Sequence, residues 1–160
     1  MNLYLDSSAI VKKYVSESGS VEVQSAIEQA EAVATTVVSR AEVVAALGKA
    51  VRMQVIGKKE AEAMVRSFNK GWRDLVRTRV TERLVKHASD LAWSHGLRGY
   101  DAVQLASAAA WQQAIGRNVT LCTFDLKVWE AARIIGLFVF RNGVNARKLT
   151  HKGQSIYPVA

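Results

Sequence analysis

The sequence predicts an α/β protein, a three-layer α/β/α sandwich with a mostly parallel central sheet. Short runs rich in β-branched and other apolar residues alternate with longer segments in which apolar residues recur at helical spacing. Such alternation is typical of a parallel sheet that helices cover on both faces. The length of 160 residues fits one domain with a complete hydrophobic core.

The first half of the chain begins with an apolar strand at residues 3–5, which a tight turn joins to a short helix. An amphipathic helix is expected at 21–31, and a strand is expected at 32–38, where β-branched residues dominate. Ser39 is expected to cap a long helix, and Gly57 breaks that helix.

The second half continues the alternation. Residues 59–76 place Met64, Phe68, Trp72 and Leu75 at helical steps, so this helix and the preceding one are expected to form an antiparallel pair. The remaining elements are predicted as strands at 77–80, 118–123 and 137–140 and helices at 81–94, 100–115 and 125–135.

The chain is strongly basic. It has 22 Lys and Arg residues against 14 Asp and Glu, a net charge of +8 and a pI near 9.9. This excess attracts polyanions, so nucleic acid is the first partner to consider, although charge of either sign also keeps proteins soluble. The densest basic stretch, residues 66–86, is interpreted either as a guide for RNA or as a solvated helix face.

The single cysteine, Cys122, is expected to be a small buried hydrophobe and indicates a reducing compartment. The N-terminus lacks the pattern of a signal peptide, and no apolar run reaches the length of a membrane span. A cytoplasmic protein without membrane association is therefore predicted.

Four acidic residues stand near predicted strand-to-helix junctions: Asp6, Glu42, Asp101 and Asp125. Because the carboxyl ends of parallel strands share one edge of the sheet, the four are expected to converge on one crevice. A carboxylate such as Asp6 is expected to need a positively charged partner there. The alternative is that Asp6, Asp101 and Asp125 cap helices and interact with the helix dipole.

Like charges in one cleft repel one another unless some are protonated or a cation neutralises them. Hard oxygen ligands without a nearby His or Cys favour Mg²⁺ or Mn²⁺ over zinc. A divalent ion held in this way can activate water and stabilise charge on a phosphate, which is the chemistry of phosphodiester hydrolysis. The acids therefore predict a magnesium-type site within a basic surface.

The ordered motifs LDSSA, SRAEV, GYDAVQLASA and TFD resemble those of PIN domains, specifically VapC-type toxins of toxin–antitoxin systems. This resemblance implies a Rossmann-like nuclease domain at residues 1–141 that acts as a Mg²⁺-dependent endoribonuclease. It also implies an RNA substrate, a cognate antitoxin, and a homodimer or dimer of dimers. Residues 142–160 are predicted to be a basic C-terminal tail.

The family's acids fall on the same four positions, so the predicted catalytic residues are Asp6, Glu42, Asp101 and Asp125. Asp6, Asp101 and Asp125 are the predicted metal ligands, while Glu42 orients a metal-bound water or acts as a base. Thr123 matches a hydroxyl that family members often carry, and Ser7 or Ser8 matches the small polar residue after the first aspartate. The further acid of some members is absent, since Val128 and Trp129 occupy its place.

Several other side chains are candidates for contact with substrate, with the core or a second copy of the chain, or with an antitoxin. Arg98 and Lys127 lie close to the acids in sequence and are candidates for contact with substrate phosphate. The four tryptophans mostly occupy apolar helical positions, which favours packing in the core or a dimer over base stacking. Val55, Ile56 and Met64, on or between the two long helices, are candidates for contact with an antitoxin.

Two alternative functions remain open at this stage. A non-catalytic PIN-like RNA-binding module would keep the fold and the basic surface without turnover. A phosphoacceptor domain would use the aspartate at the end of the first strand, but such a site typically has paired acids there, and Asp6 is followed by Ser7 and Ser8.

Overall fold

The computed structural model describes residues 1–140, which form five strands, seven α-helices and one short 3₁₀ helix, η1. In chain order, the bounds are β1 (Asn2–Leu5), α1 (Ser7–Lys12), α2 (Ser20–Glu28), β2 (Ala32–Thr36), α3 (Ser39–Arg52), α4 (Lys58–Gly71), η1 (Trp72–Asp74), β3 (Val76–Thr78), α5 (Glu82–His95), α6 (Gly99–Ile115), β4 (Val119–Cys122), α7 (Leu126–Ile134) and β5 (Phe138–Val139).

The five strands form one parallel sheet in the order β3-β2-β1-β4-β5. The chain builds the sheet from β1 outward to β3 and then crosses back to place β4 on the other side of β1. The direction of building therefore reverses between β1 and β4. In open α/β sheets, ligand crevices form at such a reversal, beyond the carboxyl ends of the strands.

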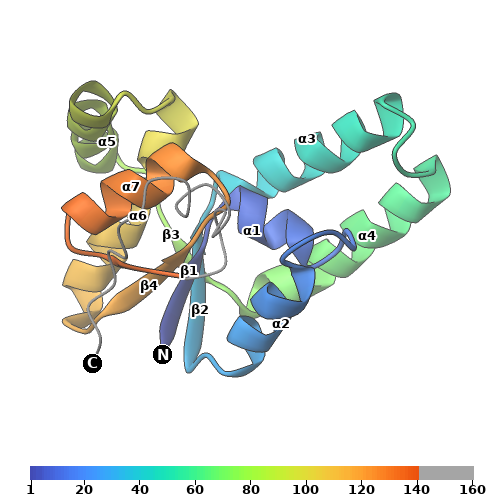
Figure 1. The fold of residues 1–160 in the computed structure, drawn as a ribbon, viewed down its shortest axis with the longest axis horizontal. Coiled ribbons are helices and arrows are strands. Elements are labelled where there is room, and N and C mark those ends of the chain that lie inside the picture. Colours follow the sequence, from blue (N-terminus) through green and yellow to red (C-terminus); the bar gives the residue numbers. More distant parts are fainter. Residues whose placement is uncertain (141–160) are drawn as a thin grey trace, which may run out of the picture.

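Helices cover both faces of this sheet (Figure 1). The alternation of side chains along β1 sends Leu3 and Leu5 into a core with α1, α2, α3 and α4, and sends Tyr4 into a second core with α5, α6 and α7. Both cores consist of fully or largely buried apolar side chains. The predicted three-layer α/β/α fold with a parallel sheet is confirmed.

Helices α3 and α4 form the expected antiparallel pair, and Figure 1 shows the pair extending away from the sheet. At the base of the pair, the buried ring of Phe68 makes edge-to-face contacts with Tyr14 and Trp72, with centroid distances of 5.8 and 5.4 Å. Such aromatic contacts add to the apolar area that the rings bury. The pair is therefore anchored to the core that contains α1.

The predicted cap at Ser39 is wrong. Helix α3 begins at Ser39 itself, and Val38 occupies the N-cap position without a side-chain hydrogen bond to the helix. The Ser39 hydroxyl instead lies within the core, 2.7 Å from the hydroxyl of Thr35. The strand predicted at 32–38 accordingly ends at Thr36, because the chain turns at that point to enter α3.

The end of the helix predicted at 59–76 is also wrong. Helix α4 ends at Gly71 and η1 follows it, because Val76 pairs with Ala34 as the first residue of β3. Trp72, Trp111 and Trp129 are buried, as expected for packing in the core, whereas 92% of the surface of Trp93 is exposed, so the core does not accommodate Trp93.

The predicted basic tail at 142–160 lies outside the described residues, so the predicted division into domains stays a prediction. Within residues 1–140, no helix combines the length and hydropathy that a membrane span requires. Cys122 is buried, as its apolar neighbours indicated.

Candidate active site

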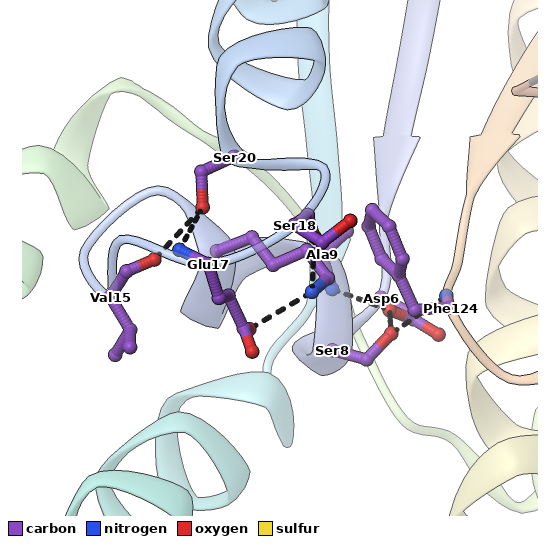
Figure 2. A network of polar contacts seen from close by, with 9 residues as sticks. Asp6, Ser8, Ala9, Val15, Glu17, Ser18, Ser20 and Phe124 are labelled. Carbon is purple, nitrogen blue, oxygen red and sulfur yellow. Dashed lines mark hydrogen bonds and ion pairs between the residues drawn. The ribbon is translucent and has the colours of Figure 1, made fainter. Parts of the chain in front are cut away.

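Asp6 follows β1 directly and lies at the reversal point of the sheet. Its side chain is 5% exposed and accepts hydrogen bonds from the Ala9 amide at 2.9 Å, from the Ser8 hydroxyl at 2.6 Å and from the Thr123 hydroxyl. The Ser8 hydroxyl in turn accepts a hydrogen bond from the Phe124 amide at 2.9 Å. Figure 2 shows the Ser8 hydroxyl bonded to both Asp6 and Phe124, so the start of α1 is joined to the loop after β4.

The capping interpretation of Asp6 therefore holds, since Asp6 is the N-cap of α1, but it does not account for the whole environment. Burial raises the pKa of Asp6 to about 6, opposed by the three donors and reinforced by the charge of Glu42. A raised pKa means that the folded protein stabilises the carboxylate incompletely.

Within residues 1–140, no basic side chain supplies the positively charged partner that Asp6 is expected to need. Within residues 1–140, the ion pairs involve Glu17 and Glu31, and none includes Asp6 or the other three acids of the proposed site. Neutral hydroxyl and amide donors stabilise Asp6 instead. Its negative charge is thus not compensated by a side chain of this part of the protein.

Glu42 is half-buried in the first turn of α3. Its Oε2 atom accepts a hydrogen bond of 2.6 Å from Nε2 of Gln104. Burial raises the pKa of Glu42, hydrogen bonds from Gln104 and Ser7 lower it, and the charge of Asp101 raises it further.

Asp101 lies in the first turn of α6, and Asp125 is the N-cap of α7. Burial and the charge of Asp125 raise the pKa of Asp101, while Arg98 opposes the shift. Oδ1 of Asp125 accepts hydrogen bonds from the amides of Lys127 and Val128, so the capping interpretation of Asp125 also holds.

The four acids interact in a series across the carboxyl edge of the sheet. Asp125 affects Asp101, Asp101 affects Glu42, and Glu42 affects Asp6. However, no three His, Cys, Asp or Glu side chains within residues 1–140 lie close enough to form a metal-binding group. The structure therefore places the predicted acids as electrostatic neighbours and not as a compact set of ligands.

The two candidate phosphate contacts have different surroundings. Arg98 is near enough to Asp101 to affect its pKa. The Lys127 ammonium lies 3.4 Å from the Gly96 carbonyl oxygen and donates to it, at the turn between α5 and α6. Both basic residues thus border the acidic edge.

Sequence reasoning missed Gln104, which is 2% exposed and contacts both Glu42 and Ser39. The sequence did contain a signal. In an alanine-rich helix, Gln104 is a long polar residue three positions after Asp101, so the two share a face of α6.

A parallel α/β/α domain with acids at its reversal point is the class that the fold and the site define. The family model for the PIN domain matches residues 3–134. Two Mycobacterium tuberculosis proteins, Ribonuclease VapC45 and Ribonuclease VapC49, are each 34% identical to this chain over 108 residues, which cover 68% of it and 75% of each relative. The chain belongs to the PIN domain family and is of the VapC type, which confirms the resemblance that its motifs indicated.

Solved structures support the same fold. The crystal structure of FitAcB from Neisseria gonorrhoeae has a TM-score of 0.61 at 16% identity and covers 88% of this chain and 97% of its own. The crystal structure of PAE2754 from Pyrobaculum aerophilum has a TM-score of 0.59 at 19% identity and covers 87% and 92%. At these identities, the likeness concerns the fold alone.

Proposed function

We propose that this protein is a metal-dependent endoribonuclease that hydrolyses RNA phosphodiester bonds and acts as the toxin of a toxin–antitoxin pair. The observation that carries the proposal is the series of mutually repelling acids at the reversal point of the sheet. Similarity to two VapC ribonucleases supports the reaction. The net charge of +8 supports a polyanionic substrate such as RNA.

Asp6, Asp101 and Asp125 would hold Mg²⁺ or Mn²⁺. Their oxygen donors suit a hard cation, and no described Lys or Arg forms an ion pair with any of them. When bound, the cation would activate a water molecule and stabilise negative charge on the phosphate. Because the described side chains form no three-ligand group, we expect them to rearrange on binding.

Glu42 would orient the attacking water or accept its proton. Its raised pKa makes the carboxylate a better proton acceptor than an exposed glutamate. Arg98 and Lys127 border the acids and would contact the substrate phosphates, which are repelled by the carboxylates themselves.

A cognate antitoxin would bind the pair formed by α3 and α4. A groove of about 560 Å³ lies between these helices, and its apolar lining includes Val44, Leu47, Val51 and Val65. Val55, Ile56 and Met64, the candidates chosen from the sequence, are not among the residues that line it. An amphipathic segment with apolar residues at helical spacing is the partner that such a groove fits.

Cleavage of RNA by the purified protein tests this function. We expect cleavage with Mg²⁺ or Mn²⁺, none with a chelator, and at least a hundredfold loss in Asp101→Asn with the fold retained. Asp90→Asn makes the same change at an exposed position of α5 and provides the control. Undiminished Mg²⁺-dependent cleavage by Asp101→Asn would contradict the proposal.

The same assay separates the alternative, a non-catalytic RNA-binding module. That module would bind RNA but show neither metal binding nor metal-dependent cleavage. Homodimer or dimer-of-dimers assembly and the cytoplasmic location remain predictions.

A further inference from the structure

Gln104 connects the proposed site to the sheet through a buried amide whose hydrogen-bonding groups are all used. Its Nε2 atom donates to the Ser39 hydroxyl at 2.9 Å and to Oε2 of Glu42 at 2.6 Å, and its Oε1 atom accepts from the Tyr4 hydroxyl at 3.1 Å. These contacts fix the orientation of the amide, because the reversed amide would turn its carbonyl oxygen toward the Glu42 carboxylate.

The network continues from Ser39 back to β1. Thr35 donates its single hydroxyl hydrogen to the carbonyl oxygen of Leu5 at 2.8 Å. The 2.7 Å contact between the two hydroxyls therefore has Ser39 as donor, which leaves Ser39 free to accept from Gln104. Because Tyr4 and Leu5 are adjacent in β1, the network forms a closed loop of bonds around Gln104.

This loop joins three of the elements that carry the acids. Gln104 lies on α6 one turn after Asp101, Glu42 and Ser39 lie on α3, and Leu5 immediately precedes Asp6. Core packing alone leaves the exposed end of a glutamate free to change rotamer, and that freedom reduces catalytic precision. A buried amide that donates directly to the carboxylate removes this freedom to change rotamer.

We propose that Gln104 is a positioning residue of the nuclease site, whose amide holds the Glu42 carboxylate in its working orientation. The inference rests on the proposed function, because it assigns Gln104 a role only through Glu42. Met and Glu at this position do not supply both donors. Met keeps the length but leaves Glu42 and Ser39 without their partner, and Glu would place a second carboxylate against Glu42.

The test compares Gln104→Met with Gln112→Met, using Mg²⁺-dependent RNA cleavage. Gln112 lies near the other end of the same helix from Asp101 and accepts a hydrogen bond of 3.0 Å from the Val119 amide. Substitution of a residue that orients a catalytic group typically lowers activity by about 10- to 100-fold. We expect a loss of kcat of that size in Gln104→Met with KM unchanged, and wild-type kinetics in Gln112→Met.

A double-mutant cycle with Glu42→Gln distinguishes positioning from a general structural effect. If Gln104 acts through Glu42, adding Gln104→Met to Glu42→Gln causes no further loss of kcat. Equal losses in both backgrounds would overturn the proposal, as would wild-type kcat in Gln104→Met or in Glu42→Gln.

Tyr4→Phe provides a second variant in case Gln104→Met does not fold. It removes the hydroxyl that donates to Oε1 of Gln104, so the amide is held less firmly against Glu42 and kcat is expected to fall several-fold with KM unchanged. Wild-type kcat in Tyr4→Phe would then overturn the proposal. Absence of metal-dependent cleavage by the wild-type protein would instead refute the proposed function, which distinguishes the two failures.

Discussion

Replacing Asp6 by Asn tests whether the acidic edge costs the folded protein stability. Asp6 is buried and accepts hydrogen bonds from Ala9, Ser8 and Thr123, yet its pKa is still raised to about 6. The donors therefore do not fully replace the hydration that the carboxylate loses. Asn has nearly the same shape and carries no charge, so it removes this cost.

The sign and size of the effect follow from the pKa. The ordinary pKa of Asp is 3.8, so between this value and about 6 the folded protein binds more protons at Asp6 than the unfolded chain does. The contribution of Asp6 to the free energy of unfolding therefore decreases as pH rises through this range. At about 1.4 kcal/mol for each pKa unit, the cost reaches about 3 kcal/mol at neutral pH.

Urea unfolding in the presence of a chelator measures this cost without bound metal. The stability of Asp6→Asn relative to the wild type is expected to rise by about 2 kcal/mol between about pH 4.5 and pH 7.5. The Asn side chain also turns an N–H group toward donors that bonded the carboxylate, but this effect is the same at every pH. Only the change of stability with pH therefore reports the cost of the Asp6 charge. Asp90→Asn, at an exposed position, serves as the control. Parallel curves for the wild type and Asp6→Asn would refute the reasoning.

Two further predictions concern the surroundings of Asp6. Thr123→Val removes a buried hydroxyl that donates to Asp6 and should lower the free energy of unfolding at neutral pH by about 1.5 to 3 kcal/mol in urea titrations, whereas Thr123→Ser keeps the donor. Equal stability of the two variants would contradict the role of the hydroxyl. Gly19→Ala should cost at least about 1 kcal/mol in the same assay, because Gly19 has φ +92° and an added Cβ would lie 2.7 Å from Cε1 of Phe124. Gly48→Ala, inside α3 and with only the flexible end of Arg52 nearby, should instead gain about 0.5 to 1 kcal/mol, and similar stabilities of the two alanine variants would argue against strain at Gly19.

The layers, the parallel sheet and the location of the acids were predictable from the sequence, because each depends on a local pattern. The apolar run before Asp6 and the turn after it indicated a strand end, and parallel strands bring such ends to one edge. The electrostatic coupling of Asp6 to Glu42 agrees with that expectation.

The role of Gln104 was not predictable in the same way. Its position on α6 indicates which face it shares with Asp101. The residues that it contacts depend on how the starts of α6 and α3, which cover opposite faces of the sheet, meet beyond the ends of the strands. Ser39 illustrates the same limit. Its local sequence favours a helix cap, whereas a stronger set of buried partners, Thr35 and Gln104, keeps the hydroxyl in the core.

Asp6 can act both as the N-cap of α1 and as a metal ligand in the proposed active site. The cap bond to Ala9 and the bond from Ser8 use Oδ1, and the Thr123 hydroxyl contacts Oδ2, so the side chain is oriented from both sides. These bonds reduce the cost of burying the carboxylate without neutralising it. A salt bridge would have cancelled the charge that a cation needs. The neutral donors around Asp6 therefore favour a carboxylate held in place for a ligand over one that serves stability alone.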